Sequence, residues 1–296
     1  MEIEPTFFGL TAADLTIKHE WFVNPVLDER PLGSWQHMLY MSLLYLVIIA
    51  PLSFLMKGRK GYLSTFVAFV HNALMSAYSL YEFIGCYLVL SRNWARHGNS
   101  PRALVCDPDA GMLDGMDFWI YTFYLSKFYE WIDTIFLIVM RGKPQVPTDD
   151  WQKVLHVFHH TVTPSIVWVA WRYRLSIAWS GPLTNSIVHV IMYAYYMLVD
   201  YVPAVRRFGV LITPVQLFQF TLCIGLLVGE IYYWFSNPSV CQPDPEPVYW
   251  LAFCYIAFLA LFVKLYIDKL NTPARAPRSS PASPSTKPAQ IKPKAE

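Results

Sequence analysis

Long apolar stretches separated by short polar segments dominate the pattern of this chain. Seven of them reach the length of about 20 residues that a helix needs to cross a lipid bilayer. They lie at 35–56, 62–90, 116–139, 153–172, 175–200, 210–235 and 248–270. We therefore expect an all-α integral membrane protein, with seven transmembrane helices forming one domain over residues 35–270.

The third stretch carries charged residues that lipid would not tolerate. Lys127, Glu130 and Asp133 follow one another at steps of three, with Thr134 next, so a helix places them on one face. A charge near the membrane centre costs about 2.5–3.5 kcal/mol on insertion scales, so each such residue needs a reason. A self-neutralising salt-bridge ladder is one interpretation, and a functional interior is the other.

Three histidines open the fourth stretch, in the run LHVFHH. His156, His159 and His160 lie at i, i+3 and i+4 and share one turn of helix. A single buried histidine is often only a satisfied core residue, whereas three on one turn indicate chemistry. These residues, called the histidine box below, leave two interpretations open: a metal site, or direct acid–base and nucleophilic catalysis.

Other stretches carry polar residues at comparable depths. They are His71, Asn185, His189, Tyr193, Gln216 and Gln219. With a rise of 1.5 Å per residue, they and the histidine box fall between the predicted cytosolic end and the membrane midplane. We expect them to line one cavity open to the cytosol, although polar pairs also join neighbouring helices in membranes.

Composition and charge agree with lipid as the solvent. Of 296 residues, 55% are hydrophobic and 15% are charged, against about 25% charged in soluble domains. A net charge of +2 gives no sign of nucleic-acid binding. Lys and Arg concentrate on one side, so the positive-inside rule predicts a cytosolic C-terminus. Residues 1–34 then form a lumenal segment without a cleavable signal, and the proline-rich residues 271–296 a disordered cytosolic tail.

The five cysteines divide into two groups. Cys106 and Cys241 fall in connections predicted to be lumenal, where oxidation is possible, so we expect a disulfide between them. Two free thiols are the alternative. Cys86, Cys223 and Cys254 fall within helices without a shared polar motif, and we expect small core residues there.

Four segments resemble the motifs of the fatty acid elongase (ELO) family, in the same order. KFYEWIDT resembles K-x-x-E-x-x-D-T, and HVFHH resembles H-x-x-H-H. HVIMYAYYML resembles H-x-x-M-Y-x-Y-Y, and TPVQLFQF resembles T-x-x-Q-x-x-Q-F. Membrane desaturases also carry H-x-x-H-H, but four ordered motifs between residues 127 and 220 are specific. The chain is similar to the very-long-chain 3-oxoacyl-CoA synthases of that family.

The resemblance implies the first step of very-long-chain fatty acid synthesis. A long-chain acyl-CoA and malonyl-CoA condense to a 3-oxoacyl-CoA two carbons longer, with release of CO2 and CoA. It also implies a helical barrel around a narrow substrate tunnel in the endoplasmic reticulum membrane, with no metal or cofactor. Expected partners are membrane lipid and the reductases and dehydratase of the elongation cycle, and a homodimer is left open. The run LHVFHH favours polyunsaturated acyl chains as substrates.

The resemblance also assigns roles. His159, the middle histidine of the box, carries the acyl group as an acyl-imidazole in a ping-pong reaction, with His189 close by. The other two histidines of the box orient it and bind the thioester oxygen. A single-step attack with His159 as general base is the alternative. Neighbouring donors such as Lys127 and Asn185 can stabilise developing oxyanions, and acidic neighbours such as Asp133 can orient an imidazole.

The candidate residues form three sets. The catalytic set is His156, His159, His160, His189, Lys127, Glu130, Asp133 and Asn185. The substrate-binding set within the stretches is His71, Tyr193, Gln216 and Gln219. The cations expected to hold the phosphates of CoA, unless they serve topology alone, are Lys57, Arg59, Lys60, Arg141, Lys143 and Arg206.

Three rival functions and one targeting signal complete the expectations. A di-iron desaturase needs more histidine ligands than this chain offers, since it has eight His in all. A seven-helix zinc hydrolase would use dispersed ligands, and a receptor or transporter would need no histidine box. The C-terminal KPKAE resembles the K-x-K-x-x retrieval signal of the endoplasmic reticulum through Lys292 and Lys294, although an ordinary Lys-rich end is the alternative.

Overall fold

The computed structural model describes residues 4–24, 26–57, 59, 64–139 and 150–271. Helices make up nearly all the regular structure of these residues, and one isolated β-bridge joins Phe7 and Leu10. The α-helices are α1 (Glu20–Val23), α2 (Trp35–Leu55), α3 (Thr65–Arg96), α4 (Asp117–Tyr129), α5 (Trp131–Val139), α6 (Asp150–Arg172), α7 (Ser180–Leu198), α8 (Gly209–Ser236) and α9 (Pro245–Asn271). The short 3₁₀ helices are η1 (Leu27–Glu29), η2 (Pro101–Leu104), η3 (Gly111–Leu113) and η4 (Pro203–Phe208).

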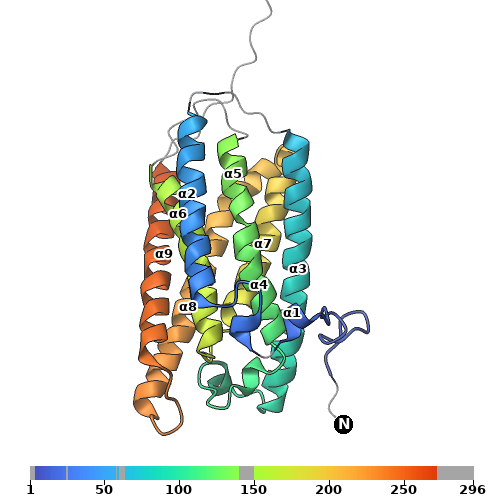
Figure 1. Cartoon of the computed structure of the whole chain (residues 1–296), viewed down its shortest axis with the longest axis vertical. Coiled ribbons are helices and arrows are strands. Elements are labelled where there is room, and N and C mark those ends of the chain that lie inside the picture. The colour runs from blue at the N-terminus through green and yellow to red at the C-terminus, as the bar shows by residue number, and fades with distance from the viewer. Residues whose placement is uncertain (1–3, 25, 58, 60–63, 140–149, 272–296) are drawn as a thin grey trace, which may run out of the picture.

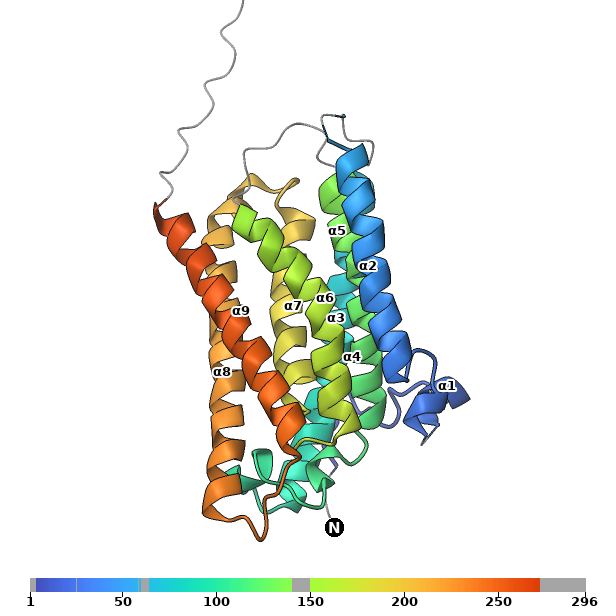
Figure 2. The same cartoon turned by 60° about the vertical axis from the view of Figure 1, so that its left-hand side comes forward.

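The long helices run side by side along the long axis of the molecule (Figure 1, Figure 2). α3 packs along α7, α8 packs along α9, and α6 contacts α2, α4 and α9. The ends of α2, α5 and α9 lie at the upper end of Figure 1. The N-terminal segment and the connections from α3 to α4 and from α8 to α9 lie at the lower end. These two ends are called the upper and lower ends below.

Four helical segments of the described chain are long and apolar enough to cross a membrane: Trp35–Leu55, Thr65–Arg96, Pro203–Ser236 and Pro245–Asn271. They coincide with the predicted first, second, sixth and seventh stretches, and the chain is a helical membrane protein. The other three predicted stretches are also helical, as α4 with α5, α6 and α7, but they are not among these candidate spans. α4 has 13 residues and α5 has 9, which is short for a membrane span. α6 and α7 are longer but carry polar residues such as His156 and Asn185.

The predicted third helix is interrupted. α4 ends at Tyr129 and α5 begins at Trp131, so Glu130 belongs to neither. The N–H of Asp133 donates to the carbonyl of Glu130, three residues back, at 3.0 Å. This bond makes a tighter turn than the four-residue bond of an α-helix. The prediction of one continuous helix over residues 116–139 is therefore wrong, and Glu130 and Asp133 contact different partners.

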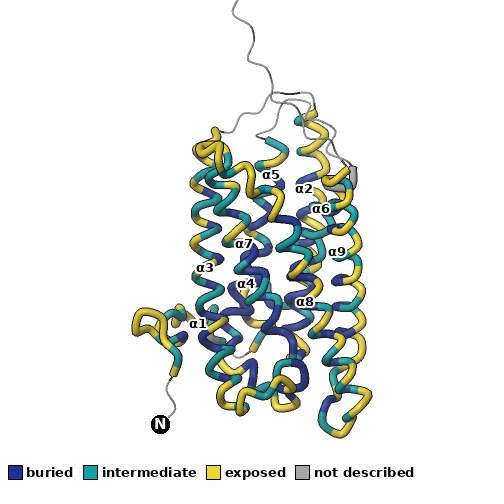
Figure 3. The backbone as a smooth tube through the Cα atoms, turned by 180° about the vertical axis from the view of Figure 1, so that it is seen from behind, coloured by how far each residue is buried: buried dark blue, intermediate teal, exposed yellow. Residues whose placement is uncertain are grey.

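Burial identifies α4 as the centre of the bundle. Nine of its thirteen residues are buried, against three of the 21 in α2. Figure 3 shows the same contrast, with buried positions gathered along α4 and exposed positions along the outer helices. Gly85 of α3 permits close approach, because a Cβ there would lie 2.1 Å from the ring of Trp119 in α4. Outer helices rich in exposed apolar residues around a polar interior are what a lipid solvent requires.

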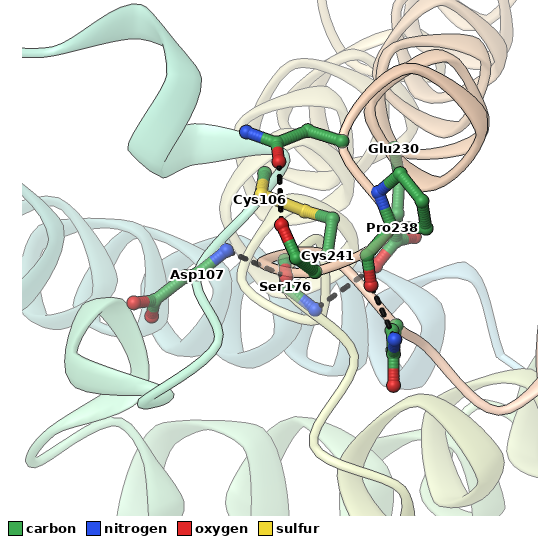
Figure 4. Close-up of a disulfide and its surroundings, with 9 residues drawn as sticks. Cys106, Asp107, Ser176, Glu230, Pro238 and Cys241 are labelled. Carbon is green, nitrogen blue, oxygen red and sulfur yellow. Dashed lines mark hydrogen bonds between the residues drawn. A yellow bond between two sulfur atoms is a disulfide. The ribbon is translucent and has the colours of Figure 1, made fainter.

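A disulfide joins two connections at the lower end. Cys106, which follows η2, is bonded to Cys241, which lies between α8 and α9. This is the pair that the sequence predicts. Figure 4 shows a polar chain beside it: the N–H of Asp107 donates to Oγ of Ser176 at 3.0 Å, and the N–H of Ser176 donates to Oε1 of Glu230 at 3.2 Å. The disulfide and these bonds together tie the lower connections to the turn before α7 and to α8.

The remaining cysteines are Cys86, Cys223 and Cys254. All three are buried and free, which agrees with the expectation of small core residues.

Candidate active site

The histidine box lies on α6 and is shaped by a proline one turn later. Pro164 has no N–H, so the carbonyl of His160 loses its usual helical donor. The indole N–H of Trp131, at the start of α5, donates to that carbonyl at 3.1 Å. Oγ1 of Thr163 also donates to the carbonyl of His159 at 2.5 Å. The box therefore sits on a turn whose freed backbone acceptor is satisfied from a neighbouring helix.

The three imidazoles lie close together, as their spacing predicts. The ring centroids of His156 and His160 are 4.4 Å apart, and those of His159 and His160 are 5.1 Å apart. Nε2 of His156 lies 2.8 Å from Oγ1 of Thr134, whose oxygen is 3.0 Å from the hydroxyl of Tyr45. Neither of the other two imidazoles forms a hydrogen bond with another described residue.

Lys127 and Glu130 form an ion pair inside the bundle. Their side chains are 1% and 2% exposed, and Nζ donates to Oε1 at 2.6 Å. The ammonium also donates to Oδ1 of Asn185 at 2.8 Å, and Nδ2 of Asn185 donates to Oε1 of Gln219 at 3.4 Å. The ladder interpretation is thus correct for one pair. The hydrogen bonds of Lys127 and Asn185 are thus made within the protein, where they join α4, α7 and α8.

Glu130 connects this ion pair with the histidines. Nδ1 of His189 lies 3.4 Å from Oε1 of Glu130, and Oγ of Ser126 donates to the same oxygen at 3.3 Å. Its other oxygen, Oε2, is buried and has no hydrogen-bond partner among the described residues. A buried acceptor without a protein partner is suited to hold a water.

Asp133 orients a different histidine from those in the box. Its Oδ1 lies 2.6 Å from Nε2 of His71 on α3, and its Oδ2 accepts from the hydroxyl of Tyr193 on α7 at 2.5 Å. His71 is 5% exposed and Tyr193 is 1% exposed. The predicted contact between an acidic residue and an imidazole is present, and it joins α3, α5 and α7.

Some candidates lie away from this cluster. Nε2 of Gln216 lies 3.8 Å from Sδ of Met192, outside the polar network. Lys57, Arg59 and Arg206 are exposed; Lys57 follows α2 and Arg206 lies in η4, both at the upper end of the bundle. The candidates that lie outside the described residues are Lys60, Arg141, Lys143, Lys292 and Lys294.

Further residues that no sequence pattern singles out come into polar contact in the structure. Tyr45, a hydroxyl in an apolar run, contacts Thr134, and Ser126, directly before Lys127, contacts Glu130. Glu82 of α3 is fully buried and accepts from Thr122 at 3.0 Å. Glu82 is an ionisable residue within a predicted span, and the cost of a charge in lipid, which singles out Lys127, applies to it as well.

The arrangement suits nucleophilic and acid–base chemistry. The imidazoles of the box lack converging anionic ligands, since the nearby carboxylates are bonded to lysine, tyrosine and other histidines. Within the described residues, no group of three or more His, Cys, Asp or Glu side chains is placed to hold a metal ion. Imidazole nitrogens without a protein partner and a buried carboxylate are the elements of an activated nucleophile or base.

Comparison with known proteins identifies the family. The model of the ELO: GNS1/SUR4 family matches residues 30–278. The chain belongs to this family. Fatty acid elongase sre1 of Dictyostelium discoideum is 30% identical over 250 residues, which cover 83% of this chain and 87% of that protein. Very long chain fatty acid elongase 4 of Mus musculus is 26% identical over 288 residues, 90% of this chain and 83% of that protein.

A third relative of this ELO-family chain is Fatty acid elongase A of Dictyostelium discoideum. It is 29% identical over 246 residues, which cover 81% of this chain and 85% of that protein. The family match contains the whole polar cluster, from His71 on α3 to Gln219 on α8. Because the relatives are named fatty acid elongases, the function that these likenesses support is fatty acid elongation.

Proposed function

We propose that this ELO-family protein is the condensing enzyme of fatty acid elongation, a very-long-chain 3-oxoacyl-CoA synthase. It joins a long-chain acyl-CoA, with polyunsaturated chains among the candidates, to malonyl-CoA and releases CO2 and CoA. The observation that carries the proposal is the histidine box, in which the imidazoles of His159 and His160 have no hydrogen-bond partner among the described residues. The backbone of the box is bonded to Trp131, which directly follows Glu130 of the buried Lys127–Glu130 pair. No cofactor is needed, because malonyl-CoA supplies the carbanion when it loses CO2.

The proposed reaction is ping-pong, with His159 as the nucleophile. A nitrogen of its imidazole attacks the thioester carbonyl, the C–S bond breaks, and CoA leaves with a proton. Malonyl-CoA then loses CO2, and the resulting enolate attacks the acyl carbon. The C–N bond breaks, its electron pair returns to the imidazole, and a proton from solvent restores the imidazole N–H. Covalent catalysis of this kind divides one difficult step into two.

The neighbours of His159 have supporting roles in this scheme. His160, 5.1 Å away between ring centroids, binds the thioester oxygen, and His156 keeps the box in place through its contact with Thr134. His189 and Glu130 relay the N–H proton of His159 to the departing CoA thiolate, and later relay a proton from solvent back to the imidazole. The alternative mechanism is a single-step attack in which His159 acts only as general base. That mechanism predicts sequential kinetics.

We further propose that α4 with α5, α6 and α7 also cross the membrane, giving seven spans around a substrate tunnel. The buried polar residues of α4 and α7 support this topology, because their ion pair and hydrogen bonds remove the main cost of placing them in lipid. The protein would reside in the endoplasmic reticulum with its C-terminus in the cytosol. The exposed Lys57, Arg59 and Arg206 would then meet CoA at the cytosolic face, and the reductases and dehydratase would complete the cycle.

One assay separates the proposal from its rivals. Membranes that contain the protein are given an acyl-CoA and labelled malonyl-CoA, and the products are identified by mass. We expect a 3-oxoacyl-CoA two carbons longer, which His159→Ala abolishes and His37→Ala, on the exposed start of α2, leaves unchanged. A desaturated chain, a free fatty acid or an unaltered acyl-CoA would instead favour a desaturase, a hydrolase or a transporter.

A further inference from the structure

A pocket of about 470 Å³ lies at the lower end of the molecule, away from the histidine box. Its walls come from η1, the first residue of α2, the end of α6 with the turn after it, and the residue before α9. Figure 2 shows these helix ends on one face, with α6 between α2 and α9. Arg172, at the pocket, is twelve residues beyond His160, or about 18 Å along the helix.

Four charged side chains line this pocket, two of each sign: Arg172, Arg174, Asp28 and Asp244. Nη1 of Arg174 is held 2.8 Å from Oδ1 of Asp117. The other three charged side chains form no ion pair with any described residue. A pocket that offers both guanidinium and carboxylate groups suits a ligand that is itself zwitterionic, because each charge of the ligand meets its opposite.

Aromatic rings form the rest of the wall. They belong to Trp35, which is 53% exposed, Tyr173, which is 44% exposed, and Trp168, which is 8% exposed. Aromatic faces beside carboxylates are the means by which proteins recognise quaternary ammonium groups. The combination of rings with Asp28 and Asp244 therefore favours a choline-like cation over a metal ion.

The pocket is built on a fixed backbone. The indole N–H of Trp168 donates to the carbonyl of Gly33 at 2.6 Å, which ties α6 to the turn between η1 and α2. Gly33 is required at that turn, because a Cβ there would lie 2.0 Å from the carbonyl oxygen of Leu27. The indole of Trp171 donates to the same carboxylate oxygen that holds Arg174, at 2.9 Å. Trp168 and Arg174 are thus positioned before a ligand arrives.

We propose that this pocket binds the headgroup of a phosphatidylcholine-type lipid. The phosphate meets the guanidinium groups of Arg172 and Arg174, and the ammonium meets the aromatic rings and the carboxylates. A lipid is favoured over a soluble zwitterion because an apolar path leads away from the pocket. Trp35, Leu39 and Leu43 lie at i, i+4 and i+8 on α2, and all three are exposed on this candidate span. An acyl chain can follow that face from the headgroup into the bilayer.

The proposal is tested by native mass spectrometry of the full chain, purified in a maltoside detergent. Phosphatidylcholine or phosphatidylglycerol is titrated, and the retained lipid is counted. We expect one phosphatidylcholine to be held about tenfold more tightly than phosphatidylglycerol, which has no cation. Arg172→Gln should weaken retention about tenfold or more, since a charge-assisted hydrogen bond is lost. Trp35→Leu should weaken it about threefold to tenfold.

Matched variants control for indirect effects. Trp21→Leu removes a tryptophan of similar exposure, 57%, outside the pocket, and Arg207→Gln removes an exposed arginine at the upper end. Both should retain phosphatidylcholine as the unmodified protein does. Asp244→Asn, an isosteric change in an exposed loop, repeats the test if Arg172→Gln fails to fold.

Three results would overturn the proposal. The first is equal retention of the two lipids, and the second is equal losses in the pocket and control variants. The third is competition by free phosphocholine at the same concentration as the lipid, which would assign the pocket to a soluble zwitterion. None of these results depends on the elongase reaction, because the readout is lipid mass and not activity.

Discussion

The buried ion pair between Lys127 and Glu130 gives a quantitative test of how the site is held together. The two side chains are 1% and 2% exposed and 2.6 Å apart. Glu130→Gln keeps the shape of the side chain but leaves the ammonium with only neutral acceptors, of which Asn185 is 2.8 Å away. Removing one partner of a buried pair costs about 3–5 kcal/mol, because the other charge stays buried without compensation.

The double variant separates structure from chemistry. Lys127→Met with Glu130→Gln removes both charges, so it should be more stable than either single variant. We expect the two changes to be non-additive by at least ~2 kcal/mol. Elongation should nevertheless remain absent in the double variant, because the carboxylate next to His189 is gone.

The free cysteines supply the assay. Cys86, Cys223 and Cys254 are buried, so a thiol-reactive fluorogenic dye reports unfolding of the purified protein on heating. Each single variant should melt roughly 10 °C lower, from about 2–4 °C per kcal/mol, and the double variant should recover most of that loss. Additive shifts would refute the reasoning about the pair. Recovery of elongation in the double variant would refute its place in the active site.

Three other predictions follow from single features of the chain. Peptide mass spectrometry without reduction should recover Cys106 bonded to Cys241, and alkylatable thiols at both would contradict it. Trp131→Phe removes the donor to the freed backbone carbonyl in the histidine box, so the protein should lose about 1–3 kcal/mol of stability and melt lower; an unchanged melting temperature would argue against this role. Replacing Lys292 and Lys294 by serine should release the protein from the endoplasmic reticulum, and unchanged retention in cells would remove the signal's role.

Periodicity predicted the parts of this structure that depend on local sequence. The helical stretches and the single-turn histidine box follow from apolar runs and from spacings of three and four. The partners of those residues depend on which helices become neighbours. Lys127, Glu130 and Asp133 are predicted to share a face. Lys127 and Glu130 do form an ion pair, but the tight turn at Glu130 gives Asp133 different partners. Asp133 therefore meets His71 on α3 instead of the histidine box.

Residues that act through a single contact were the hardest to predict. Trp131 had no polar pattern to single it out, and its role depends on the carbonyl that Pro164 frees on another helix. Glu82, by contrast, was visible in the sequence as a lone carboxylate within a span, and the structure gives it Thr122 as a donor. The pocket at the lower end, proposed to bind a lipid headgroup, combines residues from four separate segments. Its composition therefore appears only after folding.

The most direct test of the proposed mechanism is the mass of His159 after exposure to acyl-CoA alone. The purified protein is incubated without malonyl-CoA, digested and analysed by peptide mass spectrometry, while released CoA is measured in parallel. The ping-pong mechanism predicts one acyl group on the peptide that contains His159, an equal amount of free CoA, and loss of both in His159→Ala. Malonyl-CoA added afterwards should remove the label as 3-oxoacyl-CoA. An unlabelled peptide with no CoA release, from protein that condenses normally once malonyl-CoA is present, would contradict the acyl-imidazole.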